Sequence, residues 1–143
     1  MNELKLQTQI LEWVKEEGGY GRKMSHRFLV GIPDLLIRLM PPRSARGVLL
    51  VAEVKLHTRD AVLGLNDSPV KTGVTPKQHK ELGSFEHSVV LIGFKNKQGR
   101  LYALQVCDAR FTVVGHDPDF VIPIERNRLT RRLTPLILEK TYG

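Results

Sequence analysis

The chain has 143 residues, and its 22 basic and 15 acidic side chains give a formal charge of +7. This length is typical of one domain with a real hydrophobic core, and no apolar run approaches the ~20 residues that span a bilayer. A charge of this size favours polyanionic partners, nucleic acid first and anionic lipid second.

The first half of the chain predicts a helix followed by strands. Residues 3–17 carry apolar side chains at steps of three and four and are followed by a Gly-Gly pair, which predicts a helix. The basic segment 20–28 is expected to form a short exposed strand. Residues 34–40 and 48–54 are expected to form strands, and the turn-rich "PPRSARG" between them indicates an antiparallel pair.

The second half predicts a helix, several strands and a final helix. Residues 56–74 show no firm period, and a connection of that length is usually mobile or functional. Thr75 as N-cap and Pro76 at the first helical position predict a second helix. A strand is expected over 88–94, with further strands in "RLYALQV" and "RFTVV". The segment "NRLTRRLTPLILEK" indicates a short helix that Pro135 interrupts or begins.

The N-terminus and the cysteine content bear on the compartment. "MNELKLQTQ" has no apolar core of the kind a signal peptide carries. The single cysteine, Cys107, forms no internal disulfide, is expected to be a small buried residue, and favours a reducing compartment. We therefore expect a cytoplasmic protein, located in the host cytoplasm if it is viral.

Charged residues stand at the ends of two apolar strands, where a plain buried strand would not carry them. Successive side chains of a strand point to opposite faces, so Glu53 and Lys55 share one face while Val54 points to the core. Antiparallel pairing of the two strands can bring Asp34 next to Glu53. Two carboxylates suit Mg²⁺, which completes its octahedron with water and phosphate. A nearby lysine can orient the attacking water or stabilise charge on a phosphate, so the pattern suggests metal-assisted phosphodiester hydrolysis.

Each of these motifs alone is also typical of a strand end with a solvated salt bridge. Together, "GIPDLLI", "LLVAEVK" and "GVTPKQ" resemble the PD-(D/E)xK nuclease superfamily, and within it the VRR-NUC group of small viral and repair nucleases. In that group Gly-x-Pro-Asp opens one strand, Glu-Val-Lys ends the next, and a Gln follows on a helix. The N-terminal helix there begins with Glu-x-x-apolar-Gln, which Glu3, Leu6 and Gln7 match.

The resemblance covers about residues 3–94 and implies a fold. The expected fold is α/β, with a restriction-endonuclease-like αβββαβ core, a mixed central sheet and a C-terminal β/α extension over about 95–143. Residues 1–143 are expected to form a single nuclease domain. The long segment 56–74 and the extension both depart from the family pattern.

The resemblance also implies roles for individual residues. Asp34 and Glu53 would hold Mg²⁺ or Mn²⁺, helped by the backbone carbonyl of Val54. Lys55 would position or activate the attacking water.

Two further implied residues have competing explanations. Gln78 would support the lysine or contact the phosphate, but Thr75-Pro76-Lys77-Gln78 is also a capping box. Glu3 would add an outer carboxylate, as in related Holliday-junction resolvases, but an acid at a helix start also suits the helix dipole. Glu12 or Glu16 is an alternative for this acid.

Basic residues near these motifs are expected to bind phosphates, or else to form a solvated surface. They are Arg22, Lys23, His26 and Arg27 before the Asp strand, and Lys71, Lys77 and Lys80 around Gln78. A second contact surface is predicted on one helical face carrying Arg128, Arg131 and Arg132. Four histidines lack the spacing of metal ligands and are expected at the surface or in packing: His57, His79, His87 and His116. Of these, His57 is also considered as a residue near the site.

These observations predict a divalent-metal-dependent DNA endonuclease. Basic residues without base-reading motifs favour recognition of backbone and shape, so a junction or branched DNA is the expected substrate. A homodimer is expected because cutting both strands needs two sites. RNA cleavage and an exonuclease mode remain open within the same chemistry. The alternative without catalysis is a silent nuclease-like module that binds nucleic acid or a partner protein.

Overall fold

The computed structural model describes residues 1–24, 31–41, 46–59 and 69–142. Within these ranges a seven-stranded sheet has the order β1-β2-β3-β5-β6-β8-β9. β3 and β5 run parallel, whereas the other neighbouring strands run antiparallel, so the sheet is mixed. The strands are β1 (Tyr20–Lys23), β2 (Leu35–Leu39), β3 (Val48–Thr58), β5 (Ser88–Lys95), β6 (Leu101–Asp108), β8 (Val121–Glu125) and β9 (Arg128–Leu129).

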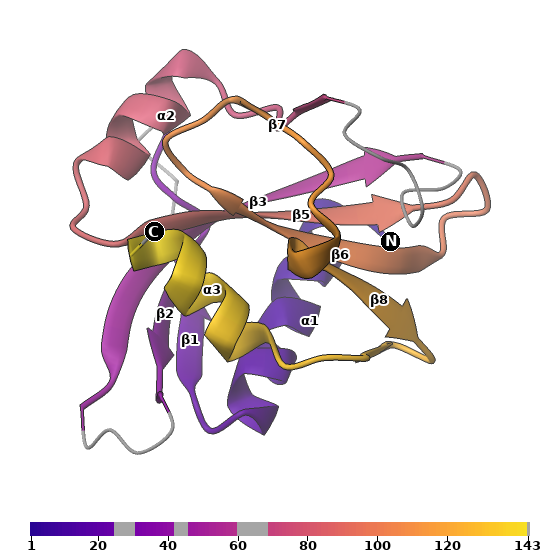
Figure 1. Cartoon of the computed structure of the whole chain (residues 1–143), viewed down its shortest axis with the longest axis horizontal. Coiled ribbons are helices and arrows are strands. Elements are labelled where there is room, and N and C mark those ends of the chain that lie inside the picture. The colour runs from indigo at the N-terminus through magenta and orange to yellow at the C-terminus, as the bar shows by residue number, and fades with distance from the viewer. Residues whose placement is uncertain (25–30, 42–45, 60–68, 143) are drawn as a thin grey trace.

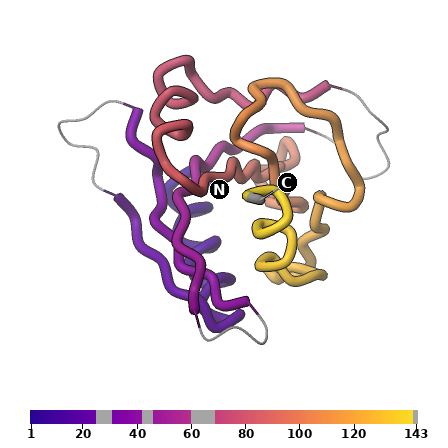
Figure 2. The backbone as a smooth tube through the Cα atoms, turned by 60° about the vertical axis from the view of Figure 1, so that its left-hand side comes forward, coloured from indigo at the N-terminus to yellow at the C-terminus, as the bar shows by residue number. Residues whose placement is uncertain are grey.

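Helices cover both faces of this sheet (Figure 1). α1 (Glu3–Glu16) and α3 (Leu133–Tyr142) pack on one face. α2 (Pro76–Gly83) packs on the other face, together with a small sheet of β4 (Val70–Lys71) and β7 (Val113–Val114). A short 3-10 helix, η1 (Pro118–Phe120), leads into β8. The backbone trace in Figure 2 shows α2 and β7 at the top of the view and α3 below them.

Helix α1 forms where the apolar spacing predicts it. Its buried side chains Leu6, Ile10 and Trp13 face the sheet. The side chain of Asn2 caps its start by accepting the Lys5 N–H at 2.9 Å. The helix ends before Gly18, whose φ of +85° is a left-handed conformation that glycine adopts at low cost.

Strand alternation divides the core into two clusters. On the face covered by α1 and α3, β3 contributes Leu50, Ala52 and Val54. On the face covered by α2, the second cluster contains Val51 of β3 and Cys107 of β6. Cys107 is buried as predicted, and burial raises the pKa of its thiol to about 12. The two odd-numbered charged residues of β3, Glu53 and Lys55, therefore lie on the α2 face.

The predicted αβββαβ order and the mixed sheet are confirmed. The antiparallel pair of β2 and β3 has the register Leu35↔Ala52. β3 is longer than expected, however, because its parallel ladder with β5 continues to Thr58. The expected irregular segment 56–74 therefore begins with strand and contains β4, and residues 60–68 lie outside the described ranges.

The C-terminal segment is β/α, as predicted, and continues the central sheet through β6, β8 and β9. The predicted basic helical face is wrong, because α3 begins only at Leu133. Arg128 lies on β9, after a tight turn with positive φ at Arg126 and Asn127. The guanidinium of Arg131 instead donates to the carbonyls of Pro118 and Val121, and Arg132 lies 3.9 Å from the Glu17 carboxylate.

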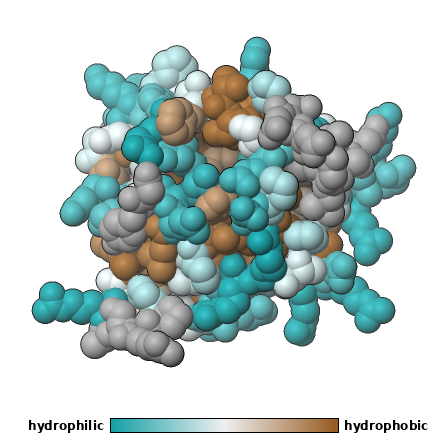
Figure 3. All heavy atoms as spheres, viewed as in Figure 1, coloured by the Kyte–Doolittle hydropathy of each residue, from teal (hydrophilic) through white to brown (hydrophobic). Residues whose placement is uncertain are grey.

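The surface is mostly polar. Figure 3 shows polar side chains over most of the face seen in Figure 1, with apolar patches between them. None of the helices in the described ranges has the length and apolar character needed to cross a membrane.

Candidate functional site

The difference in length between β2 and β3 creates an open strand edge. β2 starts at Leu35, opposite Ala52, whereas β3 runs on to Thr58. In the described part of the chain, β3 therefore has a strand neighbour only on the β5 side beyond Ala52. The Val51 N–H donates toward that side, to the carbonyl of His87. Val54 has the opposite parity, so its N–H and C=O both point to the open edge.

Asp34 occupies this edge. Its Oδ2 accepts the Val54 N–H at 2.8 Å, which takes the place of a ladder hydrogen bond. The chain reaches this position through Gly31, whose φ is +88°. A Cβ at Gly31 would come within 3.0 Å of Lys77 Cγ, so this close approach to α2 favours glycine as well. The turn thus places one carboxylate directly before the start of β2, at the Val54 N–H.

Glu53 lies beside Asp34 and is buried, with 2% of its surface exposed. The carboxyl groups of Glu53 and Asp34 form a side-chain hydrogen bond. Burial, this hydrogen bond and the charge of Asp34 raise the pKa of Glu53 to about 9. Among the described residues no group donates a hydrogen bond to the buried Oε2 of Glu53. At neutral pH the pair therefore shares a proton instead of carrying two charges.

These residues fit a small divalent cation. A cation bound between the two carboxyls would replace the shared proton and satisfy the unpartnered Oε2. The Val54 carbonyl offers a third hard oxygen on the same edge. No group of three or more His, Cys, Asp or Glu side chains suited to a metal gathers in the described ranges. The donor set is therefore two carboxylates and a carbonyl, which suits Mg²⁺ or Mn²⁺ with water and phosphate as the remaining ligands.

Lys55 follows Glu53 by two residues, so it lies on the same face of β3, and it is half-buried. Its positive charge acts to lower the pKa of Glu53, against the larger effect of burial. Its stem passes close to Gly73, where a Cβ would be 3.8 Å from Lys55 Cδ. An ammonium held between Glu53 and this turn can bind a phosphate oxygen or a water.

Glu3 approaches the carboxyl pair from the other layer. It is exposed in the first turn of α1, and its charge adds to the rise in the pKa of Glu53 and partly opposes the burial that lowers the pKa of His57. The alternative acids Glu12 and Glu16 are not among the charges that act on Glu53. The structure therefore places Glu3, rather than either alternative, near the pair.

Gln78 takes part in the capping box that the sequence also allows. Its Oε1 accepts the Thr75 N–H at 3.0 Å, and its own N–H donates to Thr75 Oγ1 at 3.1 Å. Within the described ranges its side chain makes no hydrogen bond to Glu53 or Lys55. The cap therefore accounts for the side-chain oxygen of Gln78, and its amide nitrogen stays available.

The predicted basic residues fall at different places around the site. Arg22 and Lys23 are both exposed and, as strand neighbours, point to opposite faces of β1. Lys23 Nζ donates to the Leu4 carbonyl at 3.1 Å, which ties it to the start of α1. Lys77 packs its stem against Gly31, close to Asp34. His26 and Arg27 lie outside the described residues.

Two further polar residues lie on the Lys55 face: His57, which was considered from the sequence as a residue near the site, and Arg59, which was not identified. His57 is half-buried, and its Nε2 lies 3.2 Å from the Thr72 carbonyl. Arg59 follows with the same alternation, and its N–H continues the ladder by donating to the Lys95 carbonyl at 2.9 Å. The signal that could have found them is the alternation of "EVKLHTR", in which Glu53, Lys55, His57 and Arg59 recur at every second position.

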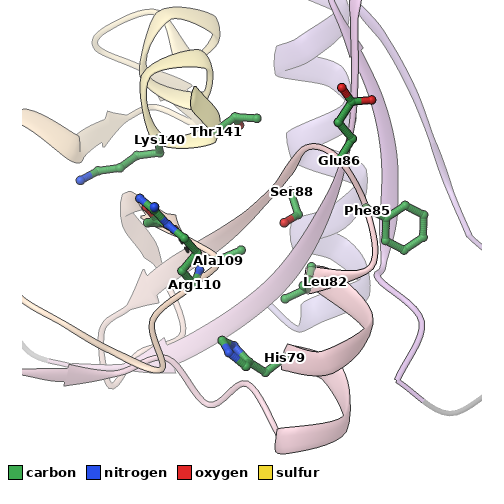
Figure 4. Close-up of a pocket in the computed structure, with 11 residues that line it drawn as sticks. His79, Leu82, Phe85, Glu86, Ser88, Ala109, Arg110, Lys140 and Thr141 are labelled. Carbon is green, nitrogen blue, oxygen red and sulfur yellow. Dashed lines mark hydrogen bonds and ion pairs between the residues drawn. The ribbon is translucent and has the colours of Figure 1, made fainter. Parts of the chain in front are cut away.

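A separate pocket of about 340 Å³ lies between α2, the start of β5 and the end of α3 (Figure 4). His79, Ser88, Arg110, Lys140 and Thr141 are among the residues that line it. In the described part of the chain, His79 Nδ1 and Thr141 Oγ1 are buried there without a hydrogen-bond partner. Asp34, Glu53 and Lys55 do not line this pocket, so it is distinct from the carboxyl site.

Comparison with solved structures shows a likeness to a known nuclease fold, whereas two other comparisons found no match. Neither a protein-family model nor a curated protein matches the chain. Among solved structures, the chain is similar to Hjc of Archaeoglobus fulgidus, a Holliday junction resolvase from an archaeal hyperthermophile. The two are 13% identical over 71% of this chain and 72% of that chain, with a TM-score of 0.43. The residue geometry described above, and not this likeness, supports the function proposed below.

Proposed function

We propose that this chain is a divalent-metal-dependent DNA endonuclease that hydrolyses phosphodiester bonds. The observation that carries the proposal is the carboxyl pair of half-buried Asp34 and buried Glu53 beside Lys55, at the open edge of β3. Burying a carboxyl without hydrogen-bond donors costs free energy, and acids with such perturbed environments are concentrated at functional sites. The net charge of +7 provides the attraction to a polyanionic substrate.

Asp34, Glu53 and the Val54 carbonyl would hold the cation, which when bound polarises the phosphate and lowers the pKa of a water. Asp34 is kept in position by the Val54 N–H. On binding of the cation, Glu53 would release to solvent the proton that it shares with Asp34. The Lys55 ammonium orients the attacking water and stabilises the negative charge that develops on the phosphate oxygens. Glu3 adds negative charge at the rim, and Gln78 offers its amide nitrogen to the phosphate or to the water beside Lys55.

The proposed substrate is a junction or branched DNA, bound through backbone and shape by basic residues such as Arg22 and Lys77. We propose that residues 1–143 act as one nuclease domain. We further propose a homodimer, because cleavage of both strands of a junction or duplex needs two sites.

The test compares cleavage of a labelled four-way junction and a matched duplex in Mg²⁺, Mn²⁺ and EDTA. Glu53→Gln and Lys55→Ala are the test variants, and Glu12→Gln, an exposed acid further along α1, is the matched control. We expect cleavage in either metal by the wild type and the control, and none in EDTA or with Glu53→Gln. Cleavage that survives both test variants contradicts the proposal. Tight DNA binding without cleavage in any metal supports the silent binding module instead.

A further inference from the structure

The face of β3 that carries Glu53 and Lys55 continues to a cation that the proposed chemistry does not use. Arg59 has the same parity as Lys55, and its backbone still pairs with β5 through the Lys95 carbonyl at 2.9 Å. At about 3.3 Å per residue, the four steps separate the two positions by about 13 Å. Side chains that stand roughly perpendicular to the sheet at these two positions would therefore reach different phosphates.

A chain of hydrogen bonds fixes the guanidinium of Arg59. Its Nη1 lies 2.8 Å from His116 Nε2, and because arginine can only donate, Nε2 accepts and Nδ1 carries the ring proton. Nδ1 then donates to Gln105 Oε1 at 3.2 Å, and Gln105 Nε2 donates to the Gly115 carbonyl at 2.8 Å. His116 and Gln105 are each only 2% exposed. The last acceptor in this series of hydrogen bonds is the backbone carbonyl of Gly115. Each donor and acceptor in the series, and therefore the tautomer of His116, is fixed as a result.

The backbone and rings around Arg59 are equally well held. The Tyr102 hydroxyl donates to the Arg59 carbonyl at 2.8 Å. The fully buried ring of Phe94 makes edge-to-face contacts with both His57 and His116, at 5.8 Å between ring centroids in each case. Arg59 is therefore preorganised, and little side-chain entropy is lost when it binds a ligand.

Every acceptor in this chain is neutral. Burial and the nearby charge of Arg59 hold the pKa of His116 below its usual range, which keeps the imidazole uncharged. Over the described ranges the guanidinium of Arg59 makes no ion pair, and of its N–H groups only those on Nη1 have a partner. A half-buried guanidinium that is fixed by a neutral partner keeps its charge and its planar donors for an external anion.

We propose that Arg59 is a phosphate-binding residue that grips the nucleic-acid backbone at a phosphate other than the one hydrolysed. His116 and Gln105 are its positioning residues, because they act on the ligand only through Arg59. The identity of the polyanion as DNA rests on the proposed function. The phosphate chemistry itself rests on the orientation of Arg59 and on its charge, which has no ion-pair partner among the described residues. A row of donors from Lys55 to Arg59 then follows the substrate backbone along β3.

The test measures DNA affinity as a function of salt in EDTA, where no cleavage interferes, with a labelled synthetic duplex. Arg59→Gln removes the charge but keeps a donor for His116, and Arg59→Lys keeps the charge. The matched control is Arg128→Gln, an exposed arginine on β9 at the other edge of the sheet. We expect Arg59→Gln to reduce the slope of log K against log salt by about 0.9, the value for one lost phosphate contact. Arg59→Lys and Arg128→Gln should leave the slope close to that of the wild type.

Equal slopes for Arg59→Gln and Arg128→Gln overturn the proposal and leave Arg59 as a structural link between β3 and the loop after β7. If Arg59→Gln does not fold, the wild-type protein provides a second measurement. Phenylglyoxal modification of Arg59, mapped by mass spectrometry, should slow when duplex DNA is added, while modification of Arg128 should not. Modification of Arg59 at an unchanged rate would also overturn it. Because neither readout involves cleavage, loss of the Arg59 contact is distinguishable from failure of the nuclease assignment.

Discussion

Two glutamates of this protein are largely buried and have opposite surroundings. Glu17 follows α1, and its side chain is 12% exposed. Its two oxygens accept the N–H groups of Leu133 and Thr134, each at 2.8 Å, at the start of α3. Glu53 on β3 faces the Asp34 carboxyl, and among the described residues nothing donates to its buried Oε2.

The difference shows that hydrogen-bond donors, rather than burial, separate a structural acid from a candidate functional one. Glu17 satisfies two N–H groups that a helix start leaves without partners, and its charge complements the dipole of α3. The hydrogen bonds of Glu17 therefore contribute to the stability of the folded protein. Glu53 keeps a proton because its environment disfavours the charge, and a cation would reverse that preference. We therefore expect substitution of Glu53 to affect mainly the cleavage rate and substitution of Glu17 to affect mainly the stability.

The largest expected effect is on catalysis. Glu53→Gln should lower the rate of junction cleavage in Mg²⁺ by about 10³-fold or more, as expected when a group that organises transition-state charge is removed. Glu17→Gln should leave the rate per folded molecule unchanged. Single-turnover cleavage at saturating enzyme separates the two effects. An equal loss of rate with Glu17→Gln would remove the distinction between the two acids.

The second expected effect is on stability and has the opposite order. Glu17→Ala leaves two helix N–H groups without their charged acceptor, so it should lower the free energy of unfolding by about 2–3 kcal/mol. Glu53→Gln should not lower it in EDTA, because the amide replaces a carboxyl that was already protonated. Urea denaturation of both variants measures this. A larger loss with Glu53→Gln would indicate that the Asp34–Glu53 pair is mainly a structural contact.

The third expected effect is the pH dependence of the metal-free protein. The pKa of Glu53 is raised from 4.5 to about 9 in the folded state, so between these values the folded chain holds a proton that the unfolded chain releases. The unfolded state binds fewer protons, and stability should therefore fall as pH rises from about 4.5 to about 9. Thermal denaturation in EDTA across this range should show the fall. Glu53→Gln should flatten the curve, whereas a curve unchanged by this variant would contradict the raised pKa.

The same proton should also appear in metal binding. Because the cation must displace it, Mg²⁺ affinity should rise with pH up to about 9, with proton release detectable by calorimetry in buffers of different ionisation enthalpy. Glu17→Gln is the control and should leave this proton release unchanged. Binding without proton release would place the cation elsewhere.

The smallest expected effect concerns Gln78 and the cap of α2. Thr75→Ala and Gln78→Ala each remove a part of the capping box, and each should cost about 1 kcal/mol of stability. If the free amide nitrogen of Gln78 contacts the phosphate or water, Gln78→Ala should lower cleavage about tenfold more than Thr75→Ala. Equal cleavage rates for the two variants would assign Gln78 to the cap alone.

The sequence by itself determined the features that depend on neighbours along the chain. Strand alternation is local, so it placed Glu53 and Lys55 on one face and Val54 in the core. The Thr75 cap was equally local, and the short β2–β3 connection made the antiparallel partner predictable. These features are sufficient to bring Asp34 to Glu53, which is why the candidate site is predictable from residue order alone.

Only the tertiary structure decided the features that join distant parts of the chain. Glu17 reaches Leu133, 116 residues away, and Arg59 reaches His116, 57 residues away. The extension of β3 to Thr58 depends on pairing with β5, which lies beyond α2 in the sequence, so the alternation of "EVKLHTR" does not by itself fix where the strand ends. No period records such long-range contacts. The donors that satisfy Glu17, their absence at the Oε2 of Glu53 in the described residues, and the fixed guanidinium of Arg59 are therefore properties of the folded chain alone.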